Sequence, residues 1–103
     1  MPRLRLRKWT VIRPMKRECY ICGIQESDYV QMERHHLLEG RGRRQISDRY
    51  GLVVDLCANC HFKAHHDSEF ADFLHRTGQR KAMNEQGWTT EEFIAVFGKN
   101  YLD

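Results

Sequence analysis

Two Cys-x-x-Cys pairs are the clearest chemical signal in this 103-residue sequence: Cys19 with Cys22, and Cys57 with Cys60. The two-residue spacing lets a tight turn present both thiolates to one tetrahedral ion, and four sulfur ligands favour zinc. The second pair is expected at the start of a helix, which helps to keep its thiols ionised. We therefore predict one structural zinc ion. The alternatives are a disulfide pair or a thioredoxin-like redox motif, for which the βαβ context is missing.

Histidines supply a second set of candidate ligands. His61 and His65 are four residues apart on the expected helix, so they share a face and can chelate one ion. His35 and His36 lie on a predicted strand, where neighbouring side chains point to opposite sides. Cys60 and His61 are consecutive, and about 100° of helical turn aims them at different places. The pattern predicts two centres, a closed cysteine site and an open histidine site.

The other histidines have a simpler interpretation. His66 is about 140° from His61 around the helix, and His75 lies further along the chain, so we expect both to meet solvent or core. Each of the candidate ligands His35, His36, His61 and His65, taken singly, has the same alternative interpretation as a surface or packed residue.

Local patterns predict the elements that must position these side chains. A strand is expected around residues 31–38, then a loop at Gly40–Gly42 and a polar turn or short helix to Tyr50. Leu52–Leu56 contains the β-branched pair Val53-Val54 and follows Gly51, which is typical of a second short strand.

Two helices are expected after the second strand. The first runs from Ala58 to about Thr77 and ends at Gly78, with Phe70, Phe73 and Leu74 as its core face. The second begins at Thr89, where Glu92 completes a capping box, and ends at Gly98.

Composition indicates one small domain, residues 1–103, with a marginal core that metal would reinforce. Its segments are a basic arm over 1–17, a zinc core over 18–77 and a helical tail over 78–103. The hydrophobic fraction is 41%, and no apolar run reaches the length of a membrane span. We expect a cytoplasmic protein, in which four cysteines more often hold metal than form disulfides.

Charge is concentrated at the N-terminus. Residues 1–17 carry +7, whereas the rest of the chain carries −4. The period-two pattern predicts a strand with one cationic face, either a charged edge strand or an arm that contacts nucleic-acid phosphates. The candidate phosphate-contacting residues are Arg3, Arg5, Arg7, Lys8, Arg34, Arg41, Arg43 and Arg44.

The combined motif resembles a known family. Cys19-x-x-Cys22, Glu33-Arg-His35-His36 and Leu56-Cys57-x-x-Cys60-His61 are similar to the His-Asn-His (HNH) endonucleases of the ββα-metal class. The short spacing and the ending Phe97-Gly-Lys-Asn-Tyr-Leu102 resemble the small phage and prophage members of that family. The resemblance covers about residues 19–66. It implies a small zinc-stapled, treble-clef-like ββα-metal core. Together with the N-terminal basic strand and the C-terminal helices predicted from local patterns, this core gives an α+β fold.

The resemblance also implies an activity and its residues. His35 and His61 would bind the catalytic metal, His65 would complete that site as in colicin-type DNases, and His36 would be the general base. The activity would be metal-dependent hydrolysis of DNA, with Mg²⁺, Mn²⁺, Ni²⁺ or Zn²⁺ as the catalytic ion and 5′-phosphate and 3′-hydroxyl ends as products. The host would be a bacterial cell.

One departure from the family keeps other functions open. The middle asparagine of the HNH motif has no counterpart between Leu37 and Leu56, where only Tyr50-Gly51 or Asp55 stands nearby. The alternatives are a catalytically inactive zinc module that binds DNA or RNA, and a structural or protein-binding zinc domain. A nuclease requires the histidines to converge, whereas a binding module requires only the cysteines.

Overall fold

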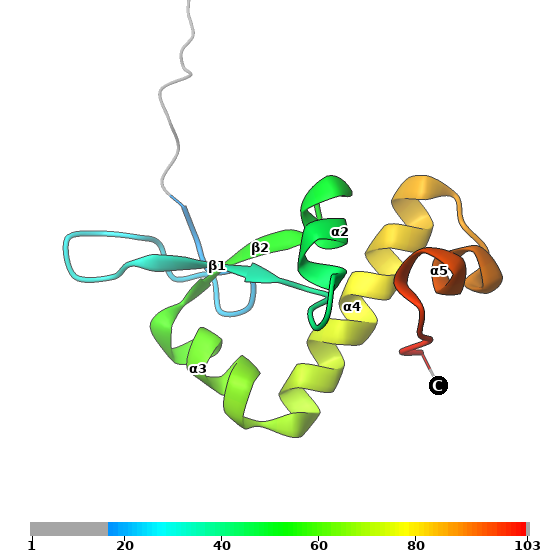
Figure 1. Cartoon of the computed structure of the whole chain (residues 1–103). Helices are drawn as coiled ribbons and strands as arrows, with labels where there is room; N and C mark the ends of the chain where they lie inside the picture. Colours follow the sequence, from blue (N-terminus) through cyan, green and yellow to red (C-terminus); the bar gives the residue numbers. More distant parts are fainter. Residues whose placement is uncertain (1–16, 103) are drawn as a thin grey trace, which may run out of the picture.

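A two-stranded sheet and four helices make up residues 17–102, the part of the chain that the computed structural model describes (Figure 1). The predicted basic strand, with Arg3, Arg5, Arg7 and Lys8, lies outside these residues. Strand β1 (Met32–His36) pairs antiparallel with β2 (Val53–Cys57), and His35 stands opposite Val54. The sheet and the separate helices confirm the predicted α+β class.

The connection between the strands holds a short helix, α2 (Arg43–Arg49). The sequence predicted either a polar turn or a short helix here. Its buried Ser47 donates a hydrogen bond from Oγ to the Leu38 carbonyl at 2.6 Å. The Ser47 carbonyl in turn accepts from the Leu52 N–H at 2.8 Å. These two bonds tie α2 to both ends of the hairpin connection, so the helix has a fixed place beside β1.

The first cysteine pair lies in a tight turn that precedes β1. The Gly23 N–H donates to the Cys19 carbonyl at 3.0 Å, and the Cys19 N–H donates to the Ile24 carbonyl at 2.9 Å. The Tyr20 N–H donates to the Asp55 carbonyl of β2 at 2.8 Å. This last bond brings the turn next to the strand that leads into the second cysteine pair.

The expected helix from Ala58 to Thr77 is wrong in its bounds. Two helices, α3 (Ala58–His66) and α4 (Ser68–Gln86), take its place. They are separated by Asp67, whose extended backbone ends α3 and whose carboxylate accepts from the Glu69 and Phe70 N–H groups at 3.0 and 3.1 Å. An aspartate cap of this kind starts a new helix rather than continuing the old one.

The predicted end of the helix at Gly78 is also wrong. Gly78 lies inside α4, where an added Cβ would meet the Leu37 Cβ at 2.9 Å and the Leu38 Cγ at 3.1 Å. The glycine is there because the hairpin packs directly against the helix backbone. The helix ends instead at Gly87, which has a left-handed φ of 70°.

The last helix, α5 (Thr90–Phe97), confirms its predicted signals. Thr89 Oγ1 accepts from the Glu92 N–H, the Glu92 side chain accepts from the Thr89 N–H, and Gly98 ends the helix at φ 83°. Figure 1 shows α4 running from α3 past the end of the hairpin to α5.

The core draws its side chains from the sheet, from the connection that holds α2, and from α3, α4 and α5. Leu74 of α4 is buried as expected, but Phe73 is 47% exposed and Phe70 is only partly buried, so the predicted core face is narrower than the sequence indicated. The fully buried side chains include Leu37, Leu52, Leu56, Leu74 and Phe93. Between residues 17 and 102, no helix combines the length and hydropathy that a membrane span requires.

Candidate metal centres

The four cysteines form one cluster. Their Sγ atoms all lie within 4.8 Å of one another, and the described structure pairs none of them in a disulfide. The Sγ atoms of Cys22 and Cys57 are 3.8 Å apart. Tetrahedral zinc with bonds of about 2.3 Å separates its sulfur ligands by about 3.8 Å. The cluster is therefore positioned to hold a metal ion, as the sequence predicted.

The cysteines of this cluster cannot all ionise easily, because neighbouring thiolates repel one another. Burial raises the pKa of Cys19, but backbone N–H groups around the turn outweigh burial and lower it to about 6. Burial and then the neighbouring thiols Cys19 and Cys57 raise the pKa of Cys60. Four thiolates cannot coexist at this spacing unless a cation compensates their charge. The donor set thus suits a divalent, sulfur-binding ion such as zinc.

Three histidines form a second cluster, separate from the cysteines. His35 comes from β1, while His61 and His65 come from successive turns of α3. One ring nitrogen of each lies within 4.8 Å of the others, and the ring centroids are 4.7 to 5.6 Å apart. Since α3 starts immediately after β2, which pairs with β1, the topology brings these residues together.

Glu33 determines which nitrogen of His61 is available to a ligand. The Glu33 carboxylate contacts His61 Nδ1 from β1. A carboxylate only accepts hydrogen bonds, so Nδ1 carries the proton and Nε2 keeps its lone pair. Nε2 lies 3.1 Å from His65 Nε2, close to the roughly 3.3 Å that separates two nitrogens on a tetrahedral ion. A carboxylate behind a metal-binding histidine is a common supporting partner.

His35 is the buried member of the cluster. Only 3% of its surface is exposed, and its ring makes no hydrogen bond with residues 17–102. Burial is the main reason that the pKa of His35 is lowered to about 4; the charge of Glu39 opposes this shift, and the neighbouring histidines add to it. The imidazole is therefore neutral near pH 7 and has an unsatisfied lone pair. A buried polar atom without a partner is unusual and fits a metal ligand.

His36, unlike His35, has a side-chain partner. Its Nε2 lies 3.0 Å from Asp48 Oδ1 on α2, and the same oxygen accepts from Arg34 Nη2 at 3.0 Å. Both His35 and His36 line a pocket of about 250 Å³. The remaining lining residues are Arg34, Glu39, Arg44, His61 and His65. The pocket combines a candidate metal centre, a separate imidazole and two guanidinium groups.

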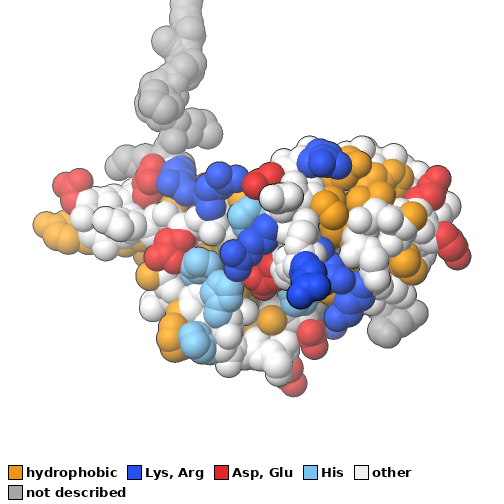
Figure 2. All heavy atoms as spheres, viewed as in Figure 1, with side chains coloured by type: hydrophobic (Ala, Val, Ile, Leu, Met, Phe, Trp, Pro, Cys, Tyr) orange, Lys and Arg blue, Asp and Glu red, His pale blue; other side chains and the backbone are white. Residues whose placement is uncertain are grey.

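The predicted arginines have different surroundings. Arg34 and Arg44 line the pocket, and Arg41 is exposed on the loop before α2. Arg43 instead donates from Nε to the Phe97 carbonyl at 2.9 Å, which ties α2 to the end of α5. Figure 2 shows basic side chains beside the histidines on one face of the molecule.

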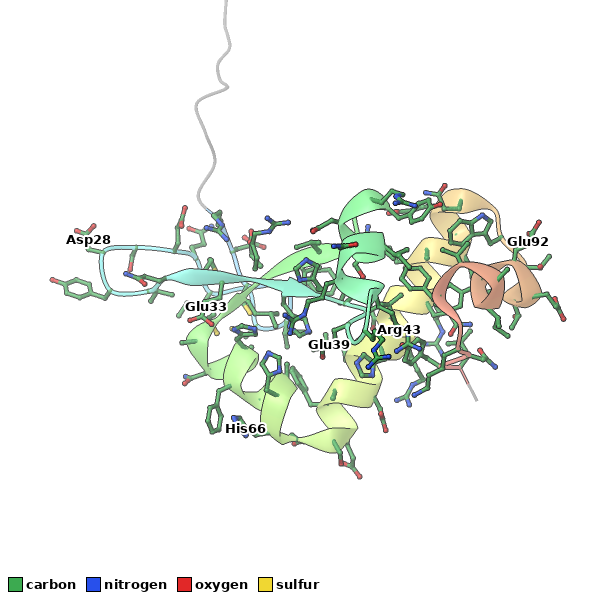
Figure 3. All side chains as sticks on the ribbon, viewed as in Figure 1. Asp28, Glu33, Glu39, Arg43, His66 and Glu92 are labelled. Carbon is green, nitrogen blue, oxygen red and sulfur yellow. The ribbon has the colours of Figure 1, made fainter. Side chains whose placement is uncertain are left out.

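The histidines outside the cluster lie as expected. His66 is exposed, and its ring lies 4.0 Å from that of Phe62. Figure 3 shows it on the side of α3 that faces away from the sheet. His75 is partly buried, its Nε2 lies 3.7 Å from Glu39 Oε2, and this neighbouring imidazole lowers the pKa of Glu39. Glu39 is therefore an anion in the wall of the pocket.

Sequence reasoning assigned no role to three acids beside the site, Glu33, Glu39 and Asp48. For Glu33 a signal existed, because a residue two positions before His35 shares its strand face. Asp48 lies 12 residues from His36 and meets it only through the fold.

Comparisons with family models, curated proteins and solved structures found no match. The function is therefore inferred from the geometry of this chain.

Proposed function

We propose that this protein is a metal-dependent DNA endonuclease of the HNH type, built on a zinc-stapled, treble-clef-like ββα-metal core. The observation that carries the proposal is the pocket in which His35, His61 and His65 converge while His36 stands apart from them. A protein that needed only a structural metal would be served by the four cysteines. The second cluster, with its open pocket, supports a catalytic role.

Zinc on the cysteines would have a structural role. Cys19 and Cys22 come from the turn before β1, whereas Cys57 and Cys60 come from the junction of β2 and α3. One ion on all four would fix the turn against the helix that carries His61 and His65. The cysteine centre would thereby position the histidine centre.

The histidine cluster would hold one divalent ion, Mg²⁺, Mn²⁺, Ni²⁺ or Zn²⁺, through neutral imidazole nitrogens. When bound, such an ion stabilises negative charge on a scissile phosphate. His36 would remove a proton from the attacking water, a role that suits histidine at physiological pH. Arg34 and Arg44 would hold the phosphate in the pocket. The products would carry 5′-phosphate and 3′-hydroxyl ends.

The basic arm would extend the contact with DNA. Its Lys and Arg side chains would meet phosphates without reading base sequence. The acidic remainder of the chain, with −4, would restrict DNA to the face that Figure 2 shows rich in basic and histidine side chains.

A second candidate function is a zinc module that binds nucleic acid without cleaving it. The specific observation in its favour is the absence of asparagine between Leu37 and Leu56. In that case the histidine cluster would have no need of a divalent ion. A nuclease would cleave DNA when a divalent ion is added, whereas a binding module would not, so one cleavage assay separates the two functions.

The test is nicking of supercoiled plasmid by the zinc-loaded protein, with and without added Mg²⁺, Mn²⁺, Ni²⁺ or Zn²⁺. We expect cleavage that requires the added ion and that His35→Ala, His61→Ala or His65→Ala greatly reduces, with partial rescue by excess metal. His66→Ala is the matched control, because its imidazole lies on α3 outside the cluster. DNA binding without cleavage under every metal would favour the binding module.

A further inference from the structure

The side chain of Asp48 occupies a position that neither metal cluster explains. It projects from α2, and its Oδ1 lies 3.0 Å from both His36 Nε2 and Arg34 Nη2. Arg34 and His36 are two residues apart on β1, so they share one face of the strand. Asp48 thus bridges the helix to that face of the strand.

Asp48 selects one tautomer of His36. Arginine has only donors, and a carboxylate has only acceptors. The Asp48 oxygen can therefore bond His36 Nε2 only if that nitrogen carries a proton. Neutral His36 then keeps its lone pair on Nδ1, the nitrogen that Asp48 does not contact. Since His36 lines the pocket, this arrangement leaves a base at the pocket wall.

The position of Asp48 is set by its neighbour in α2. Ser47 is fully buried and is held by bonds to Leu38 and Leu52. A solvent-exposed ion pair with Arg34 alone would contribute only about 0–1 kcal/mol. Stability therefore gives little reason for this geometry, whereas orientation of His36 gives a specific one.

We propose that Asp48 is a positioning residue that holds His36 as the Nε2–H tautomer, with Nδ1 directed at the attacking water. This role rests on the proposed nuclease function. Asp48 itself would touch neither DNA nor the metal ligands. Its effect on the rate of the cleavage step at saturating DNA would pass through the imidazole of His36.

The test is Asp48→Ala in the zinc-loaded, full-length protein. The side chain is half-exposed on a helix and alanine favours helix, so we expect normal folding and zinc content. The single-turnover cleavage rate at saturating DNA should fall about 10- to 100-fold, as expected when a reacting group loses its orientation. KM and Ni²⁺ affinity should stay within about twofold. Asp72→Ala, which removes an exposed aspartate from α4, is the control.

Two further readouts separate orientation of His36 from an effect on Arg34. In a His36→Ala background, Asp48→Ala should cause no additional loss of rate, because the group it orients is gone. Imidazole ¹⁵N shifts should report Nε2–H for His36 in the wild-type protein and a mixture of tautomers in Asp48→Ala. A full additional loss in the His36→Ala background, or an unchanged tautomer, would overturn the proposal.

The wild-type protein distinguishes this failure from failure of the function. If it cleaves DNA and Asp48→Ala cleaves equally fast, only the positioning role is refuted. If the wild-type protein cleaves no DNA with any of the four ions, the nuclease function fails and the positioning role fails with it.

Discussion

Replacing Glu33 by glutamine should weaken metal binding at the histidine centre while leaving the fold intact. The Glu33 carboxylate fixes the His61 ring through Nδ1, so that Nε2 faces His65. Glutamine has nearly the same shape, but it carries no charge and can present its NH₂ group instead. His61 would then lose both the fixed tautomer and the negative charge that makes its ring a better ligand.

The magnitude follows from the exposure of the pair. Loss of a carboxylate behind a metal-binding histidine costs about 10- to 100-fold in metal affinity. The Glu33 side chain is 49% exposed, and solvent screens its charge. We therefore expect the lower end, about 10-fold or about 1.4 kcal/mol.

The assay is calorimetric titration of zinc-loaded protein with Ni²⁺. Glu85→Gln provides the matched control, since Glu85 is 45% exposed, pairs with Lys81 and belongs to neither cluster. The control should bind Ni²⁺ like the wild-type protein. Equal Ni²⁺ affinity of Glu33→Gln and the wild-type protein would refute the assignment of His61 Nε2 as a supported ligand.

Three other perturbations test the fold and the sites. Chelation of zinc, or Cys57→Ser, should unfold the chain in circular dichroism, because structural zinc contributes on the order of 10 kcal/mol to a domain whose stability is about 5–15 kcal/mol; a folded zinc-free protein would contradict this. Gly78→Ala should lower the free energy of unfolding by about 1 kcal/mol, since overpacking against the Leu37 Cβ at 2.9 Å exceeds the gain of about 1 kcal/mol in helix propensity; urea titration would show a stabilised variant if the hairpin can yield. His35 has its pKa lowered to about 4, so the unfolded chain binds more protons between pH 6.5 and 4, and stability falls as pH falls through that range. The loss should be on the order of 3 kcal/mol and absent from His35→Phe, and equal pH profiles of unfolding would contradict it.

Short-range patterns predicted the parts of this protein that short-range physics determines. The capping box at Thr89 and the end of α5 at Gly98 are interactions between residues a few positions apart. The spacing within each cysteine pair is equally local. That the two pairs meet in one cluster followed from the chemistry of sulfur and metal, and the structure confirms it.

The errors come from tertiary packing and from competing local signals. A glycine in a helical pattern can mark an end or a close contact, and Gly78 is a close contact only because Leu37 and Leu38 arrive from the hairpin. The break between α3 and α4 had a local signal in Asp67, which is a strong N-cap residue, but the apolar pattern through Phe70 outweighed it. The contact of Asp48 with His36 depends on where α2 packs, which no local pattern encodes.

The most direct test of the central claim is the cleavage rate of His36→Ala at full metal loading. His36 lies beside the histidine cluster but is not one of its members. The nuclease account predicts that this variant keeps its zinc, its Ni²⁺ affinity and its DNA affinity, while single-turnover nicking of supercoiled plasmid slows by roughly 10²- to 10⁴-fold. Excess metal should not restore the rate. Nicking at the wild-type rate by His36→Ala would contradict the assignment of His36 as the general base.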